Sequence, residues 1–180
     1  MSSSISRRIN SAIESLQKND YESSFVHLFP AIDKTAKKRR PRDGVGKRIK
    51  EFLRDEEVLI SSIATHNAFK NIVVDGIDFP TAMYKFGRTS IAHEGELDER
   101  LKINEKGELK IGQTWELPTG YIVGMIISVV VAPENQGEDM DNDLGINLFD
   151  KQFKINDSWG KRDIIREHIS SMFKDPNLFD

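Results

Sequence analysis

The feature of this sequence that most constrains its fold is a nearly unbroken apolar run from Tyr121 to Ala132. Its content of Val and Ile is typical of a strand, but its length, and Pro118 just before it, favour a helix. A helix that is apolar on every side must be buried. We therefore expect a buried helix that stops at Pro133, with Gly124 and Ser128 forming a strip of small residues where another helix approaches closely.

Apolar residues upstream of this run recur at the spacing of amphipathic helices. The expected helices cover residues 4–18, 21–39, 45–65 and 79–94, and the third begins at 45 or 47 and ends between 62 and 65. Asp20 is placed to cap the second helix, and Pro30 within that helix predicts a kink rather than a break, because the apolar spacing continues past it. Gly95 follows the fourth helix, as a left-handed C-terminal cap requires.

A β-hairpin is expected over about residues 101–111. Residues 101–103 and 109–111 alternate between apolar and charged side chains, and Gly107 can take the left-handed position of the turn. The acidic segment 134–145 is typical of a mobile loop. After a short apolar piece at 146–153, residues 156–158 are placed to cap a last helix that carries apolar residues from Trp159 to Phe173.

These elements predict a mainly α protein, a helical bundle with one β-hairpin and a C-terminal helix. At 180 residues the chain is long enough to bury a sizeable core. We assign residues 1–133 to a helical domain with the inserted hairpin and 134–145 to the acidic loop. Residues 146–180 are then a C-terminal helical extension that packs on the same domain.

Composition excludes several kinds of chemistry. The chain has no cysteine, which excludes disulfides, thiol catalysis and Cys-ligated zinc. It has neither a phosphate-cradling glycine loop nor a nucleophile elbow. A calcium loop needs Gly where Leu144 stands, among the carboxylates Asp139, Asp141, Asp143 and Asp150. We therefore expect no metal and no cofactor.

The sequence also predicts where the protein resides. Its first residues lack the apolar core of a signal peptide, and no apolar stretch reaches the roughly 18 to 20 residues that cross a membrane. We expect a cytoplasmic protein that has no contact with a membrane.

Basic residues are concentrated between residues 34 and 54, although the net charge of the chain is −3. Such a face can contact the phosphates of a nucleic acid. It can also consist of basic helix ends that complement the helix dipole and of solvated side chains. The acidic segment 134–143 is a candidate to shield this face. The candidate nucleic-acid-binding residues are Lys37, Lys38, Arg39, Arg40, Arg42, Lys47 and Arg48.

Arg88 and His93 lie five residues apart near the end of the fourth expected helix, in the string FGRTSIAHEGEL. A His can move a proton near neutral pH, and an Arg can stabilise the charge that develops on a phosphate. The same loose spacing recurs at Arg162 and His168, so spacing alone does not choose a site. On an ideal helix a separation of five places two side chains about 140° apart. Both therefore reach one site only in a groove between helices, or where the helix loosens near Gly95.

The wider string resembles the signature of the HEPN superfamily, an Arg followed after four to six residues by a His, and the resemblance covers about residues 4–97. It implies a helical bundle that commonly dimerises, with two Arg and His pairs meeting across the interface. Many members are metal-independent endoribonucleases of toxin, CRISPR or phage-defence systems, and others only bind or dimerise. The resemblance implies that Arg88 binds phosphate and that His93 transfers protons. Tyr84, Thr89 and Glu94 are candidate helpers, and Thr89 stands where active members often carry Asn, Asp or His.

We therefore predict a HEPN-like RNA-binding protein, a homodimeric and metal-independent endoribonuclease of a bacterial or phage defence or toxin system. The alternative is a non-catalytic helical dimerisation or interaction module. In that reading, Lys37–Arg54 docks nucleic acid or a partner protein, the apolar helix at 121–132 builds the oligomer, and His93 only satisfies backbone carbonyls beside a structural Arg88. A regulatory protein partner is compatible with both readings.

Overall fold

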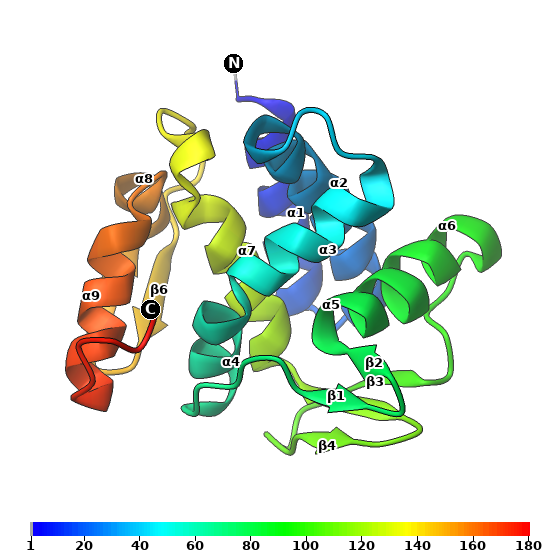
Figure 1. Cartoon of the computed structure of the whole chain (residues 1–180). Helices are drawn as coiled ribbons and strands as arrows, with labels where there is room; N and C mark the ends of the chain where they lie inside the picture. The colour runs from blue at the N-terminus through cyan, green and yellow to red at the C-terminus, as the bar shows by residue number, and fades with distance from the viewer. Residues whose placement is uncertain (1) are drawn as a thin grey trace.

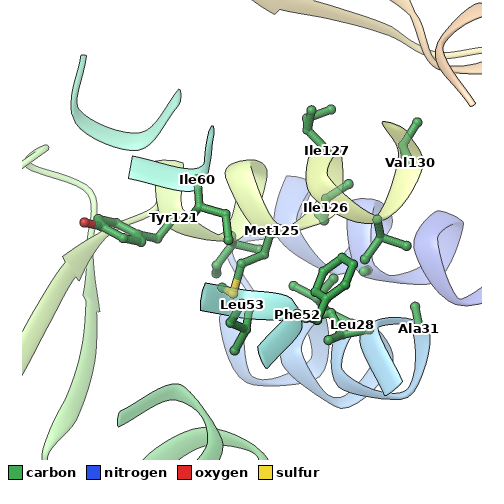
Figure 2. Close-up of a cluster of buried hydrophobic side chains, with 14 of the residues drawn as sticks. Leu28, Ala31, Phe52, Leu53, Ile60, Tyr121, Met125, Ile126, Ile127 and Val130 are labelled. Carbon is green, nitrogen blue, oxygen red and sulfur yellow. The ribbon is translucent and has the colours of Figure 1, made fainter. Parts of the chain in front are cut away.

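The apolar run forms helix α7 (Gly120–Val131), which lies near the centre of the fold in a computed structural model that describes residues 2–180 (Figure 1). Between Tyr121 and Val131 every side chain is buried except the half-buried Val123. Figure 2 shows its neighbours from earlier helices, Leu28, Phe52, Leu53 and Ile60. The predicted buried helix is confirmed. Its apolar surface is covered within the chain, so it does not supply the oligomer surface of the alternative reading.

Helix α4 (Glu57–Thr65) approaches α7 closely, as the strip of small residues predicted. A Cβ atom on Gly124 would lie 2.7 Å from the carbonyl oxygen of Ile60, and one on Gly120 would lie 2.8 Å from that of Ala64. The contact therefore requires glycine at both positions. Ser128 is buried one turn further on, where its hydroxyl donates a hydrogen bond to the Gly124 carbonyl at 2.8 Å.

Helices α1 (Ser4–Gln17) and α2 (Tyr21–Arg39) form where they were predicted and pack against each other. The hydroxyl of Ser3 caps α1 by accepting from the backbone N–H of Ile5 at 3.0 Å. Asp20 caps α2 by accepting from the N–H of Ser23 at 3.1 Å. Helix α2 continues through Pro30, so the expectation of one helix rather than two is confirmed.

The third predicted helix is wrong in one respect, because residues 45–65 form two helices, α3 (Val45–Asp55) and α4. The backbone leaves helical geometry at Glu56, where φ is −102° and ψ is 5°. Helix α3 contacts α2, whereas α4 contacts α7. Periodicity does not reveal this break, because apolar residues continue on both sides of it. The side chain at the break, that of Glu56, is fully buried.

The predicted helix over residues 79–94 is continuous but contains a π-helical segment. It consists of α5 (Phe79–Ala82), the π-helix η1 (Met83–Thr89) and α6 (Ser90–Glu94), and it ends at Gly95 with the predicted left-handed conformation, φ +80°. π-Helical turns widen the backbone spiral and are frequent at functional sites. Within η1, a Cβ atom on Gly87 would lie 2.8 Å from the ring of Phe29. This close packing fixes η1 against α2.

The predicted hairpin over residues 101–111 has the right strands but the wrong pairing. Strands β3 (Leu101–Asn104) and β4 (Lys110–Ile111) do not pair with each other, because β5 (Trp115–Pro118) lies between them. β3 is parallel to β5 and β4 is antiparallel to it. The most apolar strand takes the central place, since Trp115 and Leu117 are both buried. Gly107 takes the expected left-handed conformation, φ +74°.

Two further small hairpins were not predicted. Strand β1 (Val73–Val74) pairs with β2 (Ile77–Asp78), and β6 (Gly145–Leu148) pairs with β7 (Lys151–Lys154), both antiparallel. The structure therefore holds three small sheets where one hairpin was expected, within a chain that remains mainly α.

The C-terminal helix is also divided, contrary to prediction. A short helix α8 (Ile155–Ser158) is separated from α9 (Arg162–Phe173) by a turn at Gly160, with φ +73°. Asn156 does not cap the long helix, because its side chain bonds both the N–H and the carbonyl of Met140, at 2.8 and 2.9 Å. Helix α9 contacts α7 and buries Ile165 and Ile169.

The first half of the acidic segment, residues 134–140, is packed on the helices, which corrects the expectation of a mobile loop there, whereas residues 141–145 are mostly exposed. The packed half begins with a 3₁₀ turn, η2 (Pro133–Asn135). The buried amide of Asn135 donates to the hydroxyl of Thr35 at 2.9 Å and to the carbonyl of Val129 at 2.7 Å. Met140 is buried as well. The acidic composition predicted a solvent-exposed loop, but these buried contacts of Asn135 and Met140 hold this part of the segment in place.

Candidate functional site

Arg88, at the C-terminal end of η1, lines a cavity of about 230 Å³ between α2 and the segment η1–α6. Asp33 is the other charged residue that lines this cavity. The rest of the lining is apolar: Phe25, Val26, Phe29 and Pro30 from α2, with Ile91 and Ala92 from α6. Val26 is 40% exposed, which is unusual for a large apolar side chain in this protein. The site is therefore an apolar hollow with one cation and one carboxylate on its wall.

The guanidinium of Arg88 makes no hydrogen bond or ion pair with any of residues 2–180, although the side chain is half-buried. Arg88 makes a cation–π contact with the ring of Tyr84, whose centroid lies 5.8 Å from Cζ of Arg88. An arginine carries five N–H donors that require acceptors. The donors of Arg88 are therefore available to an anionic ligand.

Asp33 is held by Arg48 through two hydrogen bonds. Nε of Arg48 donates to Oδ1 at 2.6 Å, and the second guanidinium nitrogen donates to Oδ2 at 2.9 Å. A bidentate pair of this kind fixes the orientation of the carboxylate and compensates its charge. Because a carboxylate accepts about four hydrogen bonds in total, roughly two acceptor positions remain.

Tyr84 lies between two cations. Nζ of Lys50 is 5.9 Å from the ring centroid on the side of α3, and Arg88 follows Tyr84 within η1. The ring packs so closely on α3 that a Cβ atom on Gly46 would lie 3.0 Å from it. Lys50, like Arg88, has no hydrogen bond or ion pair to the residues that the structure describes. The surface from Lys50 to Arg88 is therefore cationic with an aromatic centre.

His93 lies in the last turn of α6, is exposed, and is not part of the cavity wall. The two motif residues thus share one continuous helical segment, but only Arg88 faces the cavity. Of the candidate helpers, Thr89 is half-buried beside Arg88, and Glu94 is exposed beside His93. The 140° separation expected for an ideal helix is consistent with this placement.

The second Arg and His pair of the sequence has structural partners. Arg162 donates to Glu56 at 3.1 Å. Nε2 of His168 lies 3.3 Å from the carbonyl oxygen of Leu148 and 3.5 Å from the carboxylate of Asp150. Contacts of this kind account for both residues without a ligand.

Most of the basic segment is neutralised within the chain. Five of the seven candidate nucleic-acid-binding residues have carboxylate partners, namely Lys38 with Glu138, Arg39 with Asp55, Glu56 and Glu134, Arg40 with Asp55, Lys47 with Asp43, and Arg48 with Asp33. Lys37 and Arg42 have no such partner among residues 2–180. Two of these carboxylates, Glu134 and Glu138, belong to the acidic segment, so that segment covers part of the basic face.

Sequence reasoning missed a buried charge cluster around Glu56. This carboxylate is fully buried and receives Arg39, Arg162 and Arg166 at 3.0, 3.1 and 3.2 Å. The signal that could have located it was a Glu inside an apolar pattern, together with two arginines four apart on the last helix. The cluster ties α2, the α3–α4 break and α9 together.

Electrostatics near this cluster favour its charged state. Burial of Glu134 is the largest influence and opposes ionisation, but the hydrogen bonds from Arg39, a backbone hydrogen bond and the charges of Arg39 and Arg162 together lower the pKa of Glu134 below its ordinary 4.5. Burial likewise opposes the charge of Arg39, while Glu134 and Glu56 raise the pKa of its guanidinium. Arg39 is therefore a structural cation.

Residues 2–180 hold neither a metal-binding cluster of acidic and His side chains nor a membrane-spanning helix. No group of three or more His, Asp or Glu side chains is placed to hold a metal ion there. None of the helices in this range has both the length and the apolar character that crossing a membrane demands.

The model of the Rv1289 family matches residues 4–178, so the chain belongs to that family. Relatives include the uncharacterized protein Mb1320 of Mycobacterium bovis and the uncharacterized proteins MT1327 and Rv1289 of Mycobacterium tuberculosis. Each is 28% identical over 181 residues, which covers 89% of this chain and 86% of the relative. No solved structure matches.

Proposed function

We propose that this protein is a HEPN-like RNA-binding protein that cleaves RNA without a metal ion, as a homodimer, in a bacterial or phage defence or toxin system. The observation that carries the proposal is that Arg88 is half-buried beside a cavity and has no carboxylate partner among residues 2–180. Most other arginines of the basic face are paired. An unpaired, partly desolvated cation suits a phosphate, and a His on the same helical segment can supply proton transfer.

The chemistry assigned to the two residues is an internal transfer of a phosphoryl group. The 2′-oxygen of RNA forms a bond to the adjacent phosphorus, and the bond from phosphorus to the 5′-oxygen breaks. One proton leaves the 2′-hydroxyl and one reaches the departing 5′-oxygen, with His93 carrying a proton. Arg88 stabilises the charge that develops on the phosphate. The products are a 2′,3′-cyclic phosphate and a free 5′-hydroxyl.

Because His93 lies outside the cavity, the reaction would require a homodimeric arrangement. A second protomer would add its own exposed His93 and its own Arg88 to a shared site. Such an arrangement agrees with the resemblance to HEPN proteins, in which two pairs meet across an interface.

The second candidate function is a non-catalytic interaction module. The observation that favours this candidate is the same separation of His93 from the cavity. Docking through Lys37–Arg54 would rely on the cations that lack carboxylate partners, Lys37, Arg42 and Lys50.

Cleavage of a labelled mixed-sequence RNA in EDTA tests the proposal. We expect the wild type to leave cyclic-phosphate ends, and His93→Ala and Arg88→Ala each to lower the rate by about 100-fold or more. His27→Ala is the control, because His27 does not line the cavity and its Nδ1 lies 3.2 Å from a guanidinium nitrogen of Arg8. A folded wild type that cleaves nothing would favour the interaction module.

A further inference from the structure

The Arg88 cavity has a composition that fits a flat, partly apolar ring attached to an anion. Phe25, Phe29 and Ile91 supply apolar walls, while Asp33 and Arg88 supply a hydrogen-bond acceptor and a cation. At about 230 Å³ the cavity is smaller than the roughly 300–1,000 Å³ of pockets for drug-sized ligands. One ring system of a larger molecule suits it better than a whole cofactor.

We propose that this cavity binds a single nucleobase of single-stranded RNA, with the adjoining phosphates on Arg88 and Lys50. The inference rests on the proposed function and deepens it, because it names the part of the substrate that the site recognises. Single-stranded RNA offers splayed bases that enter apolar pockets and phosphates that bind cations.

Charge complementarity favours this occupant over an apolar side chain of a protein. Arg88 and Lys50 both lack carboxylate partners among residues 2–180, and both lie within 6 Å of the ring centroid of Tyr84. A phosphate chain that crosses this surface meets two cations and an aromatic side chain between them. Bases stack on aromatic side chains whatever their sequence.

Asp33 gives the cavity a preference for guanine. Its carboxylate is oriented by Arg48 and retains acceptor positions. Guanine presents two adjacent N–H donors on one edge, N1–H and the 2-amino group, which one carboxylate accepts together. Uracil presents a single N–H on its corresponding edge. Because Arg48 compensates the charge of Asp33, the carboxylate does not repel the neighbouring phosphate.

The test measures RNA binding by fluorescence anisotropy in the His93→Ala background, which separates binding from cleavage. The probes are three labelled eight-nucleotide RNAs: all uridine, uridine with one central guanosine, and uridine with one central inosine, which lacks the 2-amino group. We expect the guanosine probe to bind about tenfold tighter than the all-uridine probe, and inosine to lose much of that gain.

Filling the cavity supplies the second arm. Ala92→Trp places a large ring at an exposed position of the cavity wall and is expected to weaken guanosine-probe binding about tenfold. Ala68→Trp is the matched control at an exposed position outside the cavity and is expected to change nothing. Circular dichroism and light scattering report the fold and the oligomeric state of both variants.

Binding tests the base pocket, and cleavage by the wild type tests the proposed function separately. Equal binding of the three probes, or unchanged binding by Ala92→Trp, overturns the base pocket, while cleavage by the wild type would leave the proposed function standing. Absence of both binding and cleavage overturns the pocket and the function together. If Ala92→Trp abolishes self-association and leaves RNA affinity intact, the cavity is a protein contact and the base pocket is refuted.

Discussion

Three clustered arginines and one isolated arginine of this protein lie in opposite electrostatic settings. Arg39, Arg162 and Arg166 converge on the fully buried carboxylate of Glu56. Arg88 is half-buried with only an aromatic ring and a small cavity beside it. The comparison teaches that a basic sequence does not reveal which cations are available. Carboxylates far away in the chain decide that: they neutralise Arg39, Arg162 and Arg166, whereas Arg88 has no carboxylate partner among residues 2–180.

The largest effect is expected from Glu56→Ala, which leaves three arginines without their shared partner. Breaking a buried ion pair on one side costs about 3–5 kcal/mol, because the remaining charges stay desolvated. Urea denaturation would measure the loss. Glu51→Ala is the control, since Glu51 pairs with Arg54 at the surface and its removal costs about 1 kcal/mol or less. Equal losses of stability in the two variants would show that the buried Glu56 cluster contributes no more to folding than a surface ion pair.

A smaller effect, dependent on pH, is expected from Glu134→Gln. At pH 7 the lost hydrogen bonds to Arg39 should cost about 1–2 kcal/mol. Because the pKa of Glu134 is lowered in the folded state, its contribution is complete above about pH 4.5 and disappears as the pH falls through the lowered value. The stabilities of wild type and variant should therefore converge in acid. A difference that stays constant from pH 7 to pH 3 would contradict this cause.

The smallest effect on stability is expected from Arg88→Met, which keeps the apolar stem of the side chain. With no polar partner to lose among residues 2–180, the free energy of unfolding should change by about 0.5 kcal/mol or less. Arg162→Met, measured in parallel, should cost about 1–3 kcal/mol. Thermal unfolding of the two variants makes the comparison directly. A loss from Arg88→Met as large as that from Arg162→Met would make Arg88 structural.

Periodicity predicted the helices well because it reports local burial. The apolar run at 121–132, the caps at Asp20 and Gly95 and the close approach at Gly124 are all properties of a few neighbouring residues. The mainly α fold followed from them. The break at Glu56 did not, because a buried carboxylate is stable there only when arginines from distant helices reach it.

The strand pairing failed for a related reason. The segments 101–104 and 110–111 read as a hairpin because nothing local shows that Trp115–Pro118 lies between them. In the candidate site, the sequence identified Arg88 but not its cavity, which needs Phe25, Phe29 and Asp33 from another helix. The roles of Arg88 and His93 in chemistry stay predictions.

The Glu56 cluster also has a consequence for how the chain matures on the ribosome. Glu56 and Arg162 are 106 residues apart in sequence. At about 5–20 residues per second, translation separates their appearance by roughly 5–20 seconds. During that interval only Arg39 can neutralise the carboxylate. The buried carboxylate of Glu56 therefore lacks two of its three arginine partners until α9 has been synthesised. A nascent chain stalled before α9 should remain accessible to proteases and chaperones.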